Sequence, residues 1–184
     1  MYSMDGGIEA WNGHVATGKP DQGMNLLEGV ESVEDFIMLG MKLEDGTRIF
    51  YSEAKERFGD DTSGKVFEML VNAEINHKKL LADAYRHISG RDLSPDDMEK
   101  VAGTDIIESG ESLQDILLWM KTDGRSEEEV LDLAMQIETN SLDLYLKIER
   151  EIDDKNAIKL LKKLIAEEKQ HLSSLGKLLG SRMS

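Results

Sequence analysis

A pattern of one glutamate followed by Glu-x-x-His occurs twice in this chain and constrains its fold more than any other feature. Glu44 is followed 30 residues later by the segment 74–77, Glu-Ile-Asn-His, and Glu138 is followed 30 residues later by the segment 168–171, Glu-Lys-Gln-His. Residues at positions i and i+3 of a helix lie on one face about one turn apart. Each Glu-x-x-His can therefore direct a carboxylate and an imidazole to one point, as a pair of metal ligands must.

Turn sequences lie halfway between each lone glutamate and its Glu-x-x-His. The first midpoint falls in the segment 59–61, Gly-Asp-Asp, and the second in the segment 153–156, Asp-Asp-Lys-Asn. Such clusters favour turns. Two antiparallel helices joined at each turn bring the lone glutamate level with the Glu-x-x-His. Each half is thus predicted to be a helical hairpin with its ligands at mid-height.

Equivalent residues of the two halves are separated by a constant 94 positions. Six pairs share this offset: Ser32 and Ser126, Glu44 and Glu138, Thr47 and Ser141, Tyr51 and Tyr145, Glu74 and Glu168, His77 and His171. This repetition indicates two helical hairpins related by a pseudo-two-fold axis through one shared site.

Hydrophobic periodicity and capping signals predict four long helices at about 33–58, 64–89, 127–152 and 155–179. We expect Thr62 or Ser63 to cap the second helix and Gly180 to stop the fourth. The ligand candidates fall on the apolar stripes of these helices. Four acidic residues of the first helix fall off its stripe and are expected on the solvated face: Glu34, Asp45, Glu53 and Glu56. His87 is rotated away from the face of His77 and is expected at the surface.

Residues 91–125 form a connection of roughly 35 residues, far longer than two neighbouring helices need. We expect it to contain a short helix after Ser94-Pro95 and to cross the length of the bundle. The predicted fold is therefore all-α, an antiparallel four-helix bundle with a long crossover between its second and third helices.

The chemistry of this site follows from the cost of burying charge. A carboxylate in a helical core is unfavourable unless it is paired or bound to a metal, and here four face one another. Two divalent ions neutralise four carboxylates. Oxygen and imidazole donors without thiolate suit iron or manganese, and zinc also fits. The predicted metal ligands are Glu44, Glu74, His77, Glu138, Glu168 and His171.

Composition excludes several other classes of function. A net charge of −15 disfavours nucleic acid and anionic membrane as partners. The chain has no cysteine, so it contains no disulfide, thiolate ligand or cysteine nucleophile. No basic segment precedes an apolar one at the N-terminus, and no apolar run approaches the length of a membrane span. We expect a cytoplasmic protein.

Residues 33–179 resemble the rubrerythrin-like branch of the ferritin-like superfamily, where two helices contribute one Glu each and two contribute Glu-x-x-His. The resemblance implies that Glu74 and Glu168 bridge two metals, that Glu44 and Glu138 bind terminally, and that each histidine binds one metal. It also implies that Tyr51 and Tyr145 donate hydrogen bonds to the opposite half's carboxylate; the alternative is that they are only core tyrosines. Two features depart from typical rubrerythrins, because Ser141 stands where they carry another carboxylate and no rubredoxin module is present.

The N-terminal segment differs from the rest of the chain. We divide the sequence into an extended Gly-rich arm at 1–31 and a di-metal bundle at 32–184. The stretch 6–18, which contains Gly6-Gly7-Ile8-Glu9-Ala10-Trp11, resembles the C-terminal tail of a rhodanese-like domain. The chain would then be part of a rhodanese fusion, although without a catalytic cysteine it has no sulfurtransferase activity of its own. The alternative is an arbitrary Gly-rich leader.

Together these features predict a di-iron oxidoreductase with two iron ions per chain. The resemblance implies that it reduces peroxide or dioxygen under oxidative stress, takes electrons from an external donor and forms a homodimer. Three alternatives stay open: a ferroxidase or iron-handling protein, a bundle that binds zinc or another metal without catalysis as a module of a rhodanese fusion, and hydroxylation of an organic substrate.

Overall fold

The computed structural model describes residues 30–59, 61–108, 111–121 and 125–182, and within them all regular elements are helices. These are α2 (Val33–Phe58), α3 (Thr62–Ser89), α4 (Pro95–Ala102), α5 (Leu113–Lys121), α6 (Glu127–Glu151) and α7 (Lys155–Arg182). The expected all-α class is confirmed for this part of the chain. The proposed arm at 1–31 lies, apart from its last two residues, outside the described residues.

The helix boundaries follow from local capping chemistry. Ser32 and Ser126 begin α2 and α6 with reciprocal capping boxes, as their sequences predict. The predicted cap of α3 was wrong, because Asp61 accepts the hydrogen bond from Gly64 N and Thr62 is already helical. The predicted stop at Gly180 was also wrong. Among the described glycines only Gly59, Gly90 and Gly103 adopt positive φ, so α7 continues through Gly180 to Arg182.

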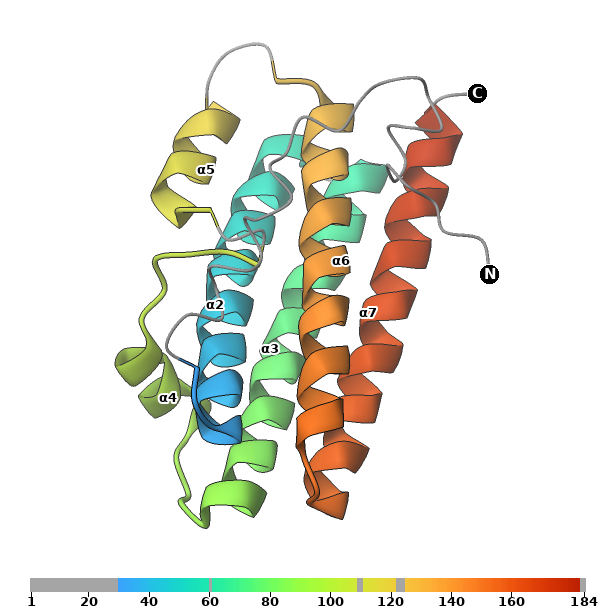
Figure 1. The fold of residues 1–184 in the computed structure, drawn as a ribbon. Helices are drawn as coiled ribbons and strands as arrows, with labels where there is room; N and C mark the ends of the chain where they lie inside the picture. The colour runs from blue at the N-terminus through green and yellow to red at the C-terminus, as the bar shows by residue number, and fades with distance from the viewer. Residues whose placement is uncertain (1–29, 60, 109–110, 122–124, 183–184) are drawn as a thin grey trace.

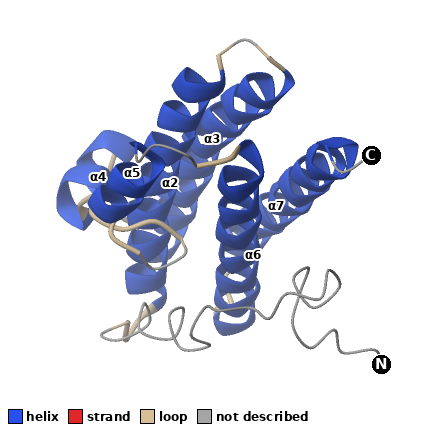
Figure 2. Ribbon diagram, turned by 90° about the horizontal axis from the view of Figure 1, so that it is seen from above, coloured by secondary structure: helices blue, strands red, loops and turns tan. Residues whose placement is uncertain are grey.

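The four long helices form a bundle in which α2 packs against α3 and α6 packs against α7 (Figures 1 and 2). The two pairs meet where α3 contacts α7 and α2 contacts α6. In Figure 1, α3 ends at the bottom of the bundle and α6 begins at its top. The segment with α4 and α5 runs between these ends beside α2, so the connection spans the length of the bundle.

A polar layer divides the core at mid-height. One apolar cluster includes Phe50, Phe67 and Ile137, and the other includes Met41, Leu81 and Leu164. On α2, Glu44 lies between Met41 of one cluster and Phe50 of the other. Glu138 is the equivalent residue on α6. Apolar side chains therefore close the polar layer on both sides along the bundle axis.

Asp45 corrects the expectation for the solvated face of α2, because it is only 4% exposed. Lys78 Nζ of α3 lies 2.6 Å from Asp45 Oδ1 and 2.6 Å from Glu99 Oε1 of α4. Arg48 adds a second cation 3.0 Å from Asp45. A helical stripe cannot anticipate this burial, since it depends on α4 covering α2 and α3. The ion pairs fasten the first part of the crossover to the bundle.

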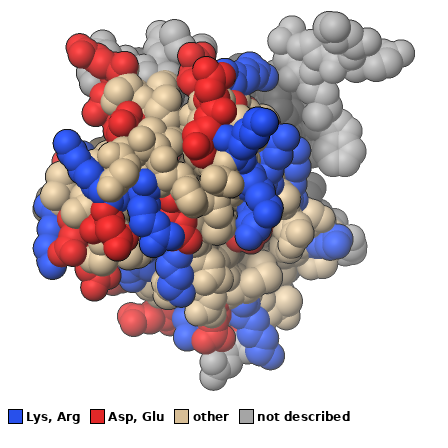
Figure 3. All heavy atoms as spheres, turned by 90° about the horizontal axis from the view of Figure 1, so that it is seen from below, with Lys and Arg blue, Asp and Glu red and all other residues tan. Residues whose placement is uncertain are grey.

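The surface carries charges of both signs. On the face seen in Figure 3, lysine and arginine side chains are interspersed with aspartate and glutamate. Among the described residues, no helix combines the length and the apolar character that crossing a membrane requires.

Candidate metal centre

The six predicted ligands are all buried and meet inside the bundle. Each of the four long helices supplies part of the set: Glu44 from α2, Glu74 and His77 from α3, Glu138 from α6, Glu168 and His171 from α7. Every one of these residues is at most 5% exposed. The sequence pattern thus correctly predicted which polar side chains the fold brings together.

The first half of the site is centred on the imidazole of His77. Its Nδ1 lies 3.1 Å from Glu44 Oε2 and 3.3 Å from Glu74 Oε2. The same nitrogen is 3.3 Å from Glu168 Oε1, which belongs to the other half. Three carboxylates therefore surround one ring nitrogen.

The second half repeats this geometry. His171 Nδ1 lies 3.0 Å from Glu138 Oε2 and 3.5 Å from Glu168 Oε2. The rings of His77 and His171 stack with centroids 5.2 Å apart. The matched distances support the pseudo-two-fold relation that the 94-residue offset predicts.

Two glutamates lie between the halves. Donor atoms of Glu44, Glu74 and His77 all fall within 4.8 Å of one another, and so do those of Glu74, Glu138 and His171. Glu74 therefore belongs to a group in each half. A third such group joins Glu168 to both histidines. Glu74 and Glu168 have the positions expected of bridging carboxylates, whereas Glu44 and Glu138 each have one histidine beside them.

Tyrosines connect the halves through hydrogen bonds. The Tyr51 hydroxyl of α2 donates to Glu138 Oε1 of α6 over 2.6 Å, and the Tyr145 hydroxyl of α6 donates to Glu44 Oε1 of α2. Both tyrosines are fully buried. Each one fixes an oxygen of the lone glutamate in the opposite hairpin, which leaves the other oxygen beside a histidine. Their expected effect on catalysis stays a prediction.

The electrostatics split the carboxylates into two classes. Burial would raise the pKa of Glu44, but His77 and the hydrogen bonds around this carboxylate lower its pKa to about 2. Burial also opposes ionisation of Glu138, yet hydrogen bonds with His171 and Glu168 keep its pKa below the usual range. Burial and the charge of Glu44 raise the pKa of Glu74 well above the usual range. Without metal, the lone glutamates are thus ionised.

Glu168 resembles Glu74, because burial and the charge of Glu138 raise its pKa strongly. Burial would lower the pKa of His77, but the carboxylates of Glu44 and Glu74 raise it well above the usual value. Glu74, Glu168 and His77 therefore retain their protons to higher pH in the folded metal-free chain than in the unfolded one. Metal ions that bind here must displace these protons.

Two buried oxygen atoms that accept no hydrogen bond test whether a metal fits; each has a histidine Nδ1 beside it, 3.3 Å from Glu74 Oε2 and 3.5 Å from Glu168 Oε2. Glu74 Oε2 and Glu168 Oε2 are buried without a hydrogen-bond partner, and they belong to the two glutamates between the halves. A buried acceptor left without a partner is costly. Cations would satisfy both atoms, and four carboxylates with two imidazoles match the donor preference of iron, manganese or zinc. The residues can hold metal, although the geometry leaves its identity open.

Glu167 is a further contact of the site that sequence reasoning missed. Its Oε2 lies 3.2 Å from His77 Nε2, the ring nitrogen opposite the one that faces the other carboxylates. A metal-binding histidine commonly has a carboxylate on its second nitrogen, which fixes the tautomer and the ring orientation. The one sequence feature that could have pointed to Glu167 is its position directly before Glu168. The equivalent residue 94 positions earlier is Ala73, so His171 has no such partner on α3.

Glu108 is a second residue that the sequence did not single out. It belongs to the crossover and is only 2% exposed. Thr47 Oγ1 donates a hydrogen bond to its Oε2 over 3.3 Å. Nothing in an acidic, aperiodic connection distinguishes this glutamate from its neighbours. The fold therefore buries a fifth carboxylate close enough to Glu44 and Glu138 for their charges to raise its pKa.

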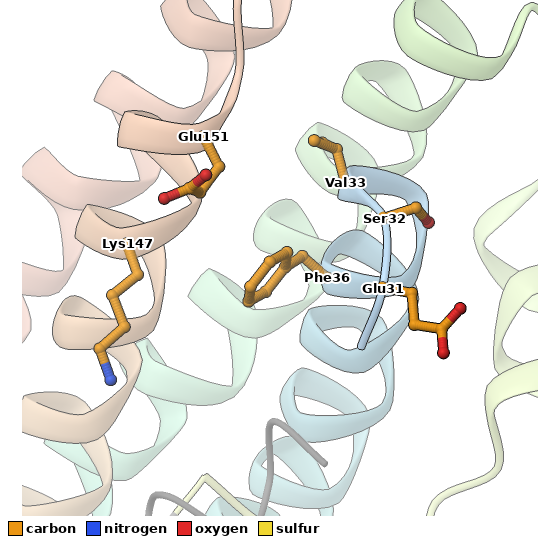
Figure 4. Close-up of a pocket in the computed structure, with 6 residues that line it drawn as sticks. All are labelled: Glu31, Ser32, Val33, Phe36, Lys147 and Glu151. Atoms are coloured by element: carbon orange, nitrogen blue, oxygen red, sulfur yellow. The ribbon is translucent and has the colours of Figure 1, made fainter. Parts of the chain in front are cut away.

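A surface hollow of about 460 Å³ lies apart from this centre (Figure 4). Its lining comes from the beginning of α2 and the end of α6: Glu31, Ser32, Val33, Phe36, Lys147 and Glu151. None of the six ligand candidates lines it. The chemistry of this chain is concentrated in the buried polar layer instead.

Comparison with known proteins adds no relative. No family description, curated protein or solved structure matches the chain. Its function must therefore be inferred from the site itself.

Proposed function

We propose that this protein is a di-iron carboxylate oxidoreductase of rubrerythrin-like type with a ferritin-like bundle. In this proposal it reduces peroxide or dioxygen with electrons from an external donor. The observation that carries the proposal is a pair of buried groups, each with two glutamates and one histidine, that share Glu74, together with a third group that joins Glu168 to both histidines. A site built only to hold one structural ion needs neither this duplication nor this total of four carboxylates.

The proposed ligand roles are those that the resemblance to rubrerythrins implies, and the grouping of the donor atoms supports them. Glu74 and Glu168 would bridge the two ions, Glu44 and Glu138 would each bind one, and each histidine would complete one position. Two Fe(II) ions held by these residues would supply one electron each, which with two protons is enough to reduce one hydrogen peroxide to two waters. Manganese and zinc fit the same donors, but zinc lacks the redox chemistry.

The protein side chains would control orientation and protons. Tyr51 and Tyr145 hold the terminal carboxylates, so these oxygens stay in one orientation when the charge of the site changes. Glu167 can fix the ring of His77. The apolar clusters above and below the polar layer keep bulk water out and strengthen every electrostatic interaction inside. Since the chain has no cysteine, reducing equivalents must come from another protein or a small molecule.

Anaerobic loading with Fe(II), followed by stopped-flow absorbance after mixing with peroxide or dioxygen, tests this function. We expect rapid oxidation of the loaded protein with a stoichiometry of two electrons per chain. The rates with peroxide and with dioxygen, compared at equal concentration, identify the preferred oxidant. A loaded protein that is inert to both oxidants would exclude the oxidoreductase. Metal analysis that recovers zinc from cells supplied with iron would support a non-catalytic bundle instead.

The iron-storage alternative differs from the proposed enzyme in how much iron the protein retains. A storage protein accumulates many ions inside a cage of many subunits, whereas the proposed enzyme retains two per chain. Sedimentation of the iron-loaded protein as a monomer or as the expected homodimer would remove the storage alternative.

A further inference from the structure

The crossover contains a short loop that carries Glu108 toward the bundle. Ile106 and Ser112 pair across the loop as an isolated antiparallel bridge. Ile107 N donates to Glu111 O over 3.1 Å, and Leu113 N donates to Asp105 O over 3.0 Å. These backbone bonds connect residues 105–107 before Glu108 with residues 111–113 after it, so the position of Glu108 does not depend on its own side chain alone.

Gly46 allows this loop to approach α2. A Cβ atom at Gly46 would overlap the carbonyl oxygen of Ile106, so no other residue fits without movement of the loop. The next loop residue, Ile107, is completely buried in the apolar cluster beside Phe50. Gly46 is two residues after Glu44. The loop is therefore packed against the turn of α2 that supplies a predicted ligand.

Glu108 lies between two equivalent positions of the hairpins. Thr47 donates to its Oε2, and the Ser141 hydroxyl lies close enough to lower its pKa. Thr47 and Ser141 follow Glu44 and Glu138 by three residues, on the same helical faces. Ser141 Oγ is also 3.1 Å from Glu168 Oε1. Glu108 is thus hydrogen-bonded to Thr47, one helical turn after Glu44, and lies within the influence of the Glu44 and Glu138 charges.

One oxygen of this carboxylate is unused in the described structure. Glu108 Oε1 is buried and has no hydrogen-bond partner. Burial and the charges of Glu44 and Glu138 raise the pKa of Glu108 well above its usual range. Its charge also contributes to the raised pKa values of Tyr51 and Tyr145. A fifth carboxylate close to the other four is unfavourable as an anion unless a cation or a proton neutralises it.

We propose that Glu108 is a seventh metal ligand, contributed by the crossover to the centre that the proposed function assigns to the bundle. This inference rests on the proposed function in one respect, because it requires that the site binds metal; it does not require the redox activity. The centre is then closed on the α2 and α6 side by a residue that neither hairpin supplies. The crossover becomes part of the metal site, and its position on α2 controls the affinity for metal.

Substitution of Glu108 by Gln removes the charge and keeps the shape of the side chain. Asp105→Asn is the matched control, because it removes one carboxylate of the same loop that is 75% exposed and pairs with Lys42. Both variants and the wild type are titrated with Co(II) against a chelator, and the visible absorption of bound Co(II) reports the ligand set. We expect about 10-fold weaker binding or more for Glu108→Gln, with an altered spectrum, and no change for Asp105→Asn.

The metal-free proteins give a second readout. Loss of a repelling charge should leave the melting temperature of metal-free Glu108→Gln equal to or above that of the wild type. A Co(II) affinity within twofold of the wild type and an identical spectrum would overturn the proposal, whatever the melting temperature. Gly46→Ala moves the loop and should weaken binding in the same way, whereas Gly176→Ala, where a Cβ meets open space, should not.

The outcomes separate this inference from the proposed function. If the wild type binds metal and Glu108→Gln binds it equally well, only the role of Glu108 as a seventh ligand is rejected. If metal binding depends on Glu108 but the Fe(II)-loaded protein is inert to oxidants, only the proposed oxidoreductase activity is rejected. A wild-type protein that binds no Co(II) or Fe(II) contradicts both.

Discussion

At the scale of single residues, the two histidines lie in matching halves of the centre and are expected to serve separate ions. Each lies beside one lone glutamate, so each should serve one ion. We predict that His77→Ala or His171→Ala weakens one metal position by about 10-fold or more and leaves the helical fold intact. Isothermal titration with Fe(II) under anaerobic conditions measures this effect. His87→Ala, at an exposed position of α3, is the control, and two unchanged binding events in His77→Ala would contradict the assignment.

The tyrosines give a subtler prediction at the same scale. Tyr145→Phe removes the hydrogen bond to Glu44 and keeps the ring that packs in the core. We expect metal affinity or the oxidation rate to fall about 10- to 100-fold, because a ligand released from its outer partner can reorient. Tyr85→Phe, which changes a buried tyrosine of α3 outside the site, should have no such effect. Equal rates and affinities in both variants would show that Tyr145 is only a core residue.

At the scale of helices, ion pairs connect α2, α3 and α4. Lys78→Ala leaves the buried carboxylate of Asp45 without the cation 2.6 Å away. Loss of one partner from a buried pair costs about 3 to 5 kcal/mol, and Arg48 reduces this loss because it also contacts Asp45. Urea unfolding should detect the change. Lys79→Ala on the exposed face of the same helix is the control, and a loss below about 1 kcal/mol would indicate that the pair adds little stability.

Helices were predictable because their signals are local. Ser32 and Ser126 gave capping boxes, and apolar periodicity gave the faces on which Glu44 and Glu138 lie. The burial of Asp45 and Glu108 could not be predicted, because it depends on where the aperiodic crossover packs. Gly46 illustrates the same limit. In the sequence it is an unfavourable residue inside a helix, and only its contact with the crossover explains it.

At the scale of the whole molecule, the buried charges make stability depend on pH. Glu74, Glu168 and Glu108 have raised pKa values in the folded state, as does His77. Each of these groups stabilises the fold fully below its unfolded pKa, and that contribution is lost as pH rises through the folded value. Glu44 and Glu138 behave oppositely, since their lowered pKa values stabilise the fold above about pH 4.5.

Above the unfolded carboxyl pKa of about 4.5, the groups with raised pKa values bind more protons in the folded chain than in the unfolded one, so the metal-free protein should lose stability as pH rises. Each proton involved contributes up to about 1.4 kcal/mol per pH unit. Metal binds more tightly as its ligands lose protons. The difference in melting temperature between loaded and metal-free protein should therefore widen from about pH 5 to about pH 7, as scanning calorimetry can measure.

General repulsion at a net charge of −15 also weakens the metal-free protein at higher pH. A double variant, Glu44→Gln with Glu138→Gln, separates the two effects, because Glu44 and Glu138 raise the pKa values of Glu74 and Glu168. The stability of the metal-free double variant should therefore change less steeply with pH than that of the wild type. A slope equal to that of the wild type would mean that these carboxylates do not share one buried layer.

The proposed division into arm and bundle gives one more prediction. Deletion of residues 1–31 should leave metal binding unchanged, because His14 is the only histidine there and the six ligand candidates lie in the bundle. Elemental analysis of the shortened protein after iron loading measures this. Loss of metal from a shortened chain that retains the helical circular dichroism of the full chain would assign the arm to the site.

Diffraction from crystals loaded anaerobically with Fe(II), measured at the iron absorption edge, tests the shared two-ion centre most directly. We expect two anomalous peaks per chain inside the polar layer, one beside His77 and one beside His171, with Glu74 and Glu168 between them. A single peak, or iron bound only elsewhere on the protein, would contradict the shared two-ion centre.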